Sequence, residues 1–207
     1  MSHAMLAVPE LSWPRRLADR LVEASSGRAA LVSLAVFVVF SATVLPWQAA
    51  QARAAVGEAG SPDTSFWYSA DRLDALAEAY GEDGRSAYVL ARVTFDVVWP
   101  LVYTAMLVLV SGWLLRRAFE AGHPARLLVL VPLLALLADY AENLCTAVVM
   151  ARYPATTPVL AELAGVMTAA KWTTLSAAFL LVPVLVVLAV VRRNRSRPEP
   201  SVVYQPR

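Results

Sequence analysis

The sequence has few of the residues that bind metals or form disulfides. Its 207 residues include one cysteine, two histidines and one lysine. Cys145 has no partner for a disulfide within the chain, and a lone buried cysteine usually behaves as a small hydrophobic residue. His3 and His123 lie away from the acids of the apolar segments, which argues against a zinc or di-iron site. We therefore expect no metal and no cofactor.

Motifs of the common enzyme classes are also missing. The sequence has no GxSxG, no HExxH and no glycine-rich phosphate-binding loop. The net charge of +2 comes from arginines that flank apolar segments, so it gives no indication of nucleic-acid binding. These absences leave the question of enzymatic activity open.

Charge is scarce, and long apolar runs take its place. Charged residues make up 16% of the chain, against about 25% in soluble domains, and hydrophobic residues make up 58%. Four stretches reach or exceed the roughly 20 apolar residues that cross a bilayer as a helix. They are 29–48, 89–115, 127–150 and 159–191. The sequence predicts an all-α membrane protein with a four-helix transmembrane bundle over 29–191.

The arginines predict the orientation, because positively charged loops stay on the cytoplasmic side. They cluster within 1–28, between the second and third spans, and after the fourth span. The loop 49–88 instead carries seven acids and three arginines. We expect a multi-pass protein of the cell membrane whose loop 49–88 lies outside. The segment 1–28 and a disordered tail, 192–207, then place both termini in the cytoplasm.

A cleaved secretory signal is the alternative for the first span. Arg28, the apolar run after it and the small-residue segment AAQARAA at 49–55 resemble such a signal. The segment before the run is long for a signal peptide, which favours a retained span.

The segment LSWPRRLADRLVEA at 11–24 has helical periodicity. Trp13, Leu17, Leu21 and Ala24 recur on one face, opposite the arginines. This pattern is typical of a helix lying on an anionic membrane surface, and equally of a solvated helix that packs against the bundle. The sequence leaves both interpretations open.

The external loop contains a second amphipathic helix, at 69–81. Ser69 can cap its N-terminus, Asp71 suits its first turn, and Gly81 can end it. Its apolar stripe consists of Leu73, Leu76, Ala77 and Tyr80. We expect this extracytoplasmic helix to rest on the outer face of the bundle.

The third span carries polar residues at its centre, in LLALLADYAENLCTAVVM at 133–150. At about 100° per residue, four polar residues share one helix face: Asp139, Glu142, Asn143 and Thr146. Four aliphatic residues cover the opposite face: Leu133, Leu137, Leu144 and Val148. Because charge that faces hydrocarbon is costly, the polar face must point into the bundle.

The same periodicity gives the second and fourth spans one polar face each. On the second span this face holds Arg92, Asp96, Trp99, Pro100 and Tyr103. On the fourth it holds Met167, Thr168, Lys171, Thr174 and Ala178. Lys171 is the only lysine among 18 basic residues. Its ammonium can lose a proton when desolvated, whereas a guanidinium effectively cannot.

The depth of each polar residue follows from about 1.5 Å of rise per residue, counted from the cytoplasmic arginines. Asp96 and Lys171 lie at one level near the outer boundary, and Glu142, Asn143 and Asp139 lie progressively deeper. The polar residues thus form a funnel that opens outward. Six aliphatic residues are expected to plug the cytoplasmic half: Leu107, Val110, Leu128, Val131, Leu185 and Val187.

These faces give a candidate ligand-binding pocket. Six residues line it: Asp96, Tyr103, Asp139, Glu142, Asn143 and Lys171. Four residues lie at its mouth: Tyr80, Arg85, Arg92 and Trp99. Counting Arg92 and Lys171 against the three acids Asp96, Asp139 and Glu142 leaves one excess acid, which a proton or a cationic ligand could balance. Alternatively the polar side chains only hold the helices together, which suits the four-residue pair of Arg92 and Asp96 better than two carboxylates that repel each other.

Three strings form a wider pattern: AYGEDGRSAYVLARVTFDVVWPLVY at 79–103, LLADYAENL at 136–144 and AAKWTTL at 169–175. This pattern resembles small four-span bacterial membrane proteins of unassigned activity, and the similarity covers the last three spans. It implies a set of residues that work together, without implying a reaction. They are Tyr80, Gly81, Gly84, Arg85, Asp96, Pro100, Tyr103, Asp139, Glu142, Asn143 and Lys171.

Three functional classes fit these features. We favour the binding or movement of a small or amphiphilic ligand, with the acids holding a cation or proton, because the site has no nucleophile with an evident base. One alternative is an intramembrane lipid-modifying enzyme, in which a carboxyl group and Lys171 share acid and base roles. The other is a structural or accessory subunit. The expected partners are the lipid bilayer and a small-molecule or lipid ligand, and the sequence indicates no nucleic acid and no particular oligomeric state.

Overall fold

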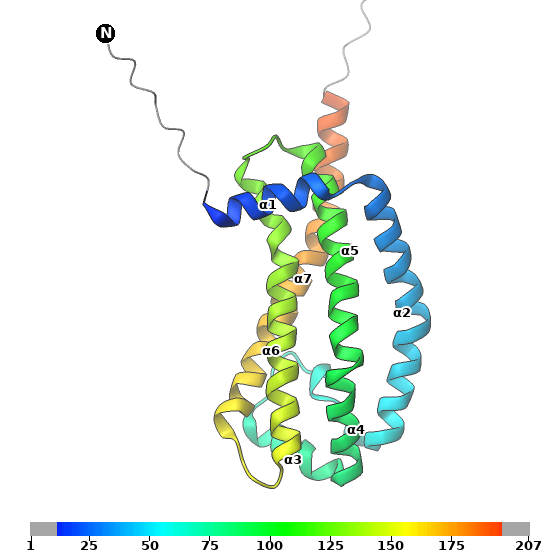
Figure 1. Ribbon diagram of the computed structural model, residues 1–207, viewed down its shortest axis with the longest axis vertical. Coiled ribbons are helices and arrows are strands. Elements are labelled where there is room, and N and C mark those ends of the chain that lie inside the picture. Colours follow the sequence, from blue (N-terminus) through cyan, green and yellow to red (C-terminus); the bar gives the residue numbers. More distant parts are fainter. Residues whose placement is uncertain (1–11, 196–207) are drawn as a thin grey trace, which may run out of the picture.

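The fold is an all-α bundle built on four long helical segments (Figure 1). The computed structural model describes residues 12–195. The segments are α2 (Gly27–Val56), α4 (Gly81–Val93) with α5 (Phe95–Ala118), α6 (Val131–Arg152) and α7 (Pro158–Arg195). Each is long and apolar enough to cross a membrane. The predicted fold class is therefore confirmed, and the chain is a multi-pass membrane protein.

The helices extend beyond the predicted spans. The good helix formers of 49–56 carry α2 past the apolar run to Val56, and α4 already begins at Gly81. The loop predicted at 49–88 therefore shrinks to 57–80. The helix α7 continues to Arg195, so the first residues of the predicted disordered tail are helical. The rest of that tail and residues 1–11 lie outside the described residues.

The second span is interrupted at Thr94, which the sequence did not predict. Thr94 has a φ of −121° and a ψ of −81°, and it separates α4 from α5. Its hydroxyl donates a hydrogen bond to the carbonyl of Leu90 at 2.6 Å, a local bond that bends helices. The break lies between Arg92 and Asp96, so it affects how both side chains enter the bundle.

The loop end of the bundle, which carries residues 57–80, is capped by α3 (Ala70–Ala79). The side chain of Ser69 accepts a hydrogen bond from the amide of Arg72 at 3.3 Å, and Gly81 ends the segment at a φ of +63° that favours glycine. The apolar stripe is buried: Leu73, Leu76, Ala77 and Tyr80. It packs on α6 and α7, which confirms the predicted amphipathic helix.

The loop is fastened to α7 at two neighbouring positions. The amide of Ala70 donates a hydrogen bond to the carboxylate of Glu162 at 3.0 Å. One turn further, the carbonyl oxygen of Tyr68 approaches Gly165 so closely that a Cβ there would lie 2.1 Å from it. Only glycine lets the loop backbone reach the helix at this point.

Replacing Gly165 with alanine is therefore expected to push the loop away from α7. Overpacking of this kind costs about 1–3 kcal/mol, so the melting temperature in detergent should fall. Thr173→Ala, on the exposed face of the same helix, is the matched control and should leave it nearly unchanged. Equal stability of the two variants would show that the loop does not depend on this contact.

At the opposite end, α1 (Trp13–Ala24) lies across the bundle (Figure 1). Ala18 and Val22 are buried, and α1 contacts α5 and the 3-10 helix η3 (Pro124–Leu130). The buried guanidinium of Arg126 binds Glu23 at 2.7 Å and Asp19 at 3.3 Å. The helix therefore packs against the bundle, but mainly through Ala18 and Val22 rather than through the apolar stripe predicted from the sequence. Trp13 and Leu17 are exposed, so contact with a membrane surface stays a prediction for that face.

The four spans pack unevenly. The helix α2 contacts α5 and α4 through few buried side chains, and Leu137 and Leu144 of α6 are exposed, as expected for lipid-facing residues. An apolar core fills the end near α1: Leu107, Leu115, Val129 and Leu185. The predicted plug is wrong at Leu128 and Val187, which are 39% and 61% exposed. These two side chains lie on the outside of their helices.

Candidate functional site

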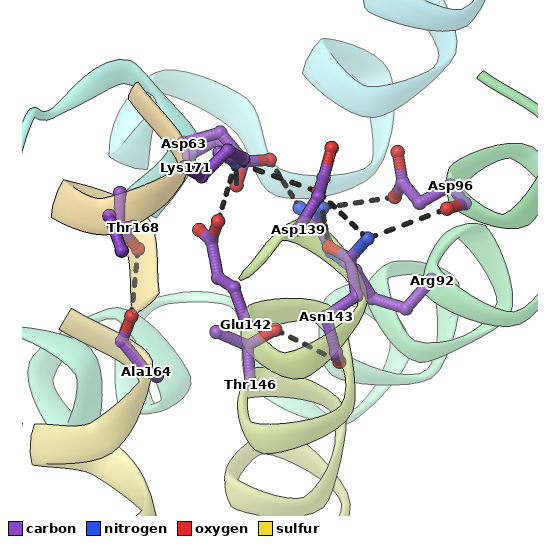
Figure 2. Close-up of polar contacts among 12 residues, drawn as sticks. Asp63, Arg92, Asp96, Asp139, Glu142, Asn143, Thr146, Ala164, Thr168 and Lys171 are labelled. Carbon is purple, nitrogen blue, oxygen red and sulfur yellow. Dashed lines mark hydrogen bonds and ion pairs between the residues drawn. The ribbon is translucent and has the colours of Figure 1, made fainter. Parts of the chain in front are cut away.

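A cluster of charged side chains lies inside the bundle near its loop end (Figure 2). The helix α6 contributes Asp139, Glu142 and Asn143, which are 7%, 0% and 5% exposed. These residues share the helix face that the sequence predicted to point inward. They are joined by Arg92 of α4, Tyr103 and Asp96 of α5, Lys171 of α7, and Asp63 of the loop. We refer to these eight residues as the carboxylate cluster.

Lys171 is surrounded by three carboxylates. Its Nζ lies 2.5 Å from Oε2 of Glu142, 3.7 Å from Oδ1 of Asp63 and 3.8 Å from Oδ1 of Asp139. The residue is 6% exposed. At these distances in a buried setting Lys171 stabilises all three negative charges, and Glu142 most directly.

Arg92 holds the other half of the cluster. Its guanidinium contacts Oδ2 of Asp63 at 2.5 Å and Oδ2 of Asp96 at 3.0 Å, and it donates to Oδ1 of Asn143 at 2.9 Å. The planar guanidinium also stacks on the ring of Tyr88 at 4.3 Å. The Arg92–Asp96 pair is therefore one edge of a larger network that also joins α4 to the loop and to α6.

Asp139 is the acid with the weakest ionic compensation. The hydroxyl of Tyr103 donates to its Oδ2 at 2.7 Å, and Nδ2 of Asn143 donates to its Oδ1 at 3.1 Å. The nearest cationic atom is Nζ of Lys171 at 3.8 Å. Two neutral donors thus hold this carboxyl in place, and it shares Lys171 with two other acids.

The cluster contains more acid than base. Asp63, Asp96, Asp139 and Glu142 face only Arg92 and Lys171. The carboxyl groups of Asp63 and Glu142 also lie close together, because both contact Nζ of Lys171, at 3.7 and 2.5 Å. Uncompensated charge is expensive in a low-dielectric interior. The arrangement is therefore suited to hold a proton or a cation between its carboxyl groups.

Sequence analysis missed Asp63, which it counted only among the acids that set the orientation of the loop. The other loop acids include Asp71, Glu78 and Asp83, which are exposed, and no pattern separates Asp63 from them. Asp63 lies in the short 3-10 helix η2 (Pro62–Thr64), where the hydroxyl of Ser61 donates to it at 3.2 Å. The fold of the loop, rather than helical periodicity, brings it to the cluster.

Three residues predicted at the mouth lie beside the carboxylate cluster, and Trp99 makes an edge contact with Tyr103 at 5.8 Å between ring centroids. Trp99 stacks on Phe37 and Phe40 of α2, at 5.6 and 5.5 Å between ring centroids. The hydroxyl of Tyr80 donates to the carbonyl of Gly60. Arg85 donates to the carbonyl of Ala77. These contacts hold α2, the loop and α3 in place, so the structure gives the three residues supporting positions. Arg92, the fourth, lies inside the cluster.

Asp63 ties the stability of the loop to pH. Burial opposes ionisation of its carboxyl, but the charges of Arg92 and Lys171 outweigh burial and hold the pKa well below its usual 3.8. A carboxyl whose pKa is lowered on folding stabilises the fold above its unfolded pKa, and this contribution is lost as the pH falls through the folded value.

The protection factors of the loop amides, which correct the exchange rates for their intrinsic pH dependence, should therefore be unchanged from neutral pH down to about pH 5 and should fall only below the ordinary aspartate pKa of about 4. Asp63→Asn should lower these protection factors throughout the range above that pKa. Asp71→Asn, at an exposed position of α3, is the control. Protection factors of the loop amides that already fall between about pH 7 and pH 5 in the parent would show that Asp63 is not held ionised by its two cations.

Within the part of the chain that the structure describes, no group of three or more His, Cys, Asp or Glu side chains is arranged so that it could hold a metal ion. The carboxylate cluster is held by ion pairs and hydrogen bonds among the chain's own residues. Comparison with known proteins adds no assignment: no protein-family model, no curated protein and no solved structure matches the chain.

Proposed function

We propose that this multi-pass protein of the cell membrane binds a cation in its carboxylate cluster. The cation is a proton or the charged group of a small amphiphilic ligand, and its binding accompanies the movement of that ligand. The observation that carries the proposal is that the carboxyl groups of Asp63 and Glu142 both contact a single lysine, Lys171. A proton or cation between them relieves their repulsion.

The exposure of the acids supports access from the loop end. Side-chain exposure falls from 31% at Asp63 through 16% at Asp96 to 10% at Asp139 and 0% at Glu142. Asp63 and Asp96 fit the outward-opening funnel expected from the sequence, but the order of the two inner acids is reversed, because Asp139 was expected to lie deepest and is more exposed than Glu142. Because Asp63 belongs to the loop, movement of the loop removes one carboxyl from both Arg92 and Lys171. The loop movement that opens the site therefore also removes one negative charge from it.

The proposed orientation places the loop outside and α1 in the cytoplasm. The arginine distribution supports it. We also propose that the chain is related to small four-span bacterial membrane proteins of unassigned activity. In a Cys145→Ala background, a cysteine at the exposed position 75 should react from outside. A cysteine at position 121 should react only after permeabilisation. The reverse labelling pattern would contradict the proposed orientation.

A second candidate is an intramembrane lipid-modifying enzyme. It is favoured by the 2.5 Å separation of Lys171 Nζ and Glu142 Oε2, which is short enough for a proton to pass between an acid and a base. Lipid profiles of cells with and without the protein separate the two candidates. A lipid that changes in covalent structure, rather than in location, would favour the enzyme.

The proposed cation site can be tested by infrared spectroscopy of the protein in lipid nanodiscs. We expect a protonated-carboxyl C=O band in the parent at neutral pH, because four acids face two cations. Tetraphenylphosphonium, used as the probe cation, should weaken this band as it replaces the proton. Glu142→Gln should alter the band, and Asp71→Asn, which changes an exposed acid, should not. A parent spectrum with no such band, and with no response to the probe, would contradict the proposal.

A further inference from the structure

A groove lies between α5 and α7 at the end of the bundle near α1, away from the carboxylate cluster. It encloses about 410 Å³, within the range of roughly 300–1,000 Å³ found for small-molecule sites. Trp113 and Leu114 form one wall, and Val186 and Val190 form the other. Ala189 leaves room between them. The walls are apolar along the direction in which the helices cross the membrane.

Two arginines stand at the rim of this groove. Arg117 lies with its guanidinium 4.1 Å from the centre of the Trp113 ring. Arg192 lies 4.6 Å from the Phe119 ring and donates to the carbonyl of Ala118 at the end of α5. Both arginines are exposed, and stacking on an aromatic face fixes the plane of each guanidinium. Among the described residues that line the groove there is no acid.

We infer that this groove binds an anionic phospholipid. An apolar groove with a cationic rim near the ends of two membrane-spanning helices matches a molecule with acyl chains and a negative head. The phosphate pairs with Arg117 and Arg192, since guanidinium groups form paired hydrogen bonds with phosphate oxygens. One acyl chain lies along Val186, Ala189 and Val190. The site is independent of the carboxylate cluster, which has the opposite charge and lies at the other end of the bundle.

Trp113 provides a direct probe, because it forms part of the groove wall. The protein is placed in phosphatidylcholine nanodiscs that contain one-tenth of a brominated lipid, either phosphatidylglycerol or phosphatidylcholine. Bromine on an acyl chain in the groove quenches Trp113. The Trp113 signal is the difference between the parent and Trp113→Phe. We expect stronger quenching by brominated phosphatidylglycerol, with an apparent preference of about fivefold for each arginine that contacts the head.

Two variants separate the groove from general surface charge. The double change Arg117→Gln with Arg192→Gln should remove the preference for phosphatidylglycerol. Arg15→Gln with Arg20→Gln removes the same charge from exposed positions of α1 and should keep it. Glycerol phosphate without acyl chains should not compete if the lipid is the ligand. Competition by it would mean that the rim binds free phosphate, and would overturn the lipid assignment.

Ala189→Leu serves as a second test because it fills the groove and keeps both arginines. It should reduce quenching by both brominated lipids in a protein whose melting temperature is close to that of the parent. Equal quenching by the two lipids in the parent would overturn the inference. The inference would also be overturned if the double variant of Arg117 and Arg192 and the double variant of Arg15 and Arg20 lost the preference for phosphatidylglycerol to the same extent.

Discussion

Replacing Lys171 with methionine is expected to lower the free energy of unfolding by about 3–5 kcal/mol, the usual cost of leaving a buried charge without its partner. Lys171 is the one cation beside Glu142, which is completely buried, and it also faces Asp63 and Asp139. Thermal melting in detergent measures the loss. Lys171→Met with Glu142→Gln should recover much of it, because the double variant removes both buried charges of the closest pair.

Asp96 provides the matched control for this cycle. Its carboxylate pairs with Arg92 at 3.0 Å, so Asp96→Asn should not rescue Lys171→Met. The coupling energy of a double-mutant cycle should therefore be large for Lys171 with Glu142 and close to zero for Lys171 with Asp96. Additive effects in the first cycle would show that Lys171 and Glu142 do not pair in the folded protein.

Replacing Arg92 with methionine is expected to be about as costly, again about 3–5 kcal/mol. Arg92 is 8% exposed and bridges Asp63 of the loop, Asp96 of α5 and Asn143 of α6. Its loss should also release the loop, so protease should cut within 57–80 more readily. Arg92→Lys should rescue poorly, because an ammonium lacks the planar fork that reaches three partners at once.

The replacement of Arg92 has two expected effects, a loss of stability and an opening of the loop, and a second change at Asp63 separates them. Arg92→Met with Asp63→Asn should recover stability, since the loop acid then carries no charge, yet the loop should stay open to protease because its tether is gone. Arg85→Met is the control for general loosening at this end, as Arg85 binds a carbonyl and not an acid. If Arg92→Met destabilises the bundle without exposing the loop, Arg92 does not fasten the loop.

Helical periodicity predicted the interior part of the cluster from sequence. Asp139, Glu142, Asn143 and Thr146 are all buried on the face that the pattern assigned to the bundle interior. The reason is physical: charge must avoid hydrocarbon, so a polar stripe in an apolar helix has one possible direction. The amphipathic stripe of α3 was predictable for the same reason.

Contacts made by irregular backbone were not predictable. Asp63 reaches the cluster through a 3-10 turn in the loop, and the break at Thr94 separates Arg92 on α4 from Asp96 on α5. Trp99 shares a helix face with Tyr103, but its ring extends sideways onto Phe37 and Phe40 of α2. Periodicity gives the direction of a side chain from its own helix, and says nothing about which neighbouring helix fills the space beside it.

The position of Asp63 changes the chemical character of the site. The spanning helices alone carry three acids and two cations, an imbalance of one charge. The loop raises the acids to four, so a closed loop strengthens the demand for a proton or cation. The loop therefore covers the site and also contributes one of the carboxyl groups that bind the proton or cation. We expect the loop to be closed more often when the site is occupied than when it is empty.

Asp139→Asn tests the central claim most directly, because asparagine keeps the size of the side chain while removing its charge. The amide can still accept from Asn143 and donate to the hydroxyl of Tyr103. The variant should stay folded. With tetraphenylphosphonium as the probe, the parent should show a rise in melting temperature that the variant loses. If the parent shows no rise, the carboxylate cluster only holds the helices together and the proposed cation site is wrong, and if Asp139→Asn responds to the probe like the parent, Asp139 takes no part in that site.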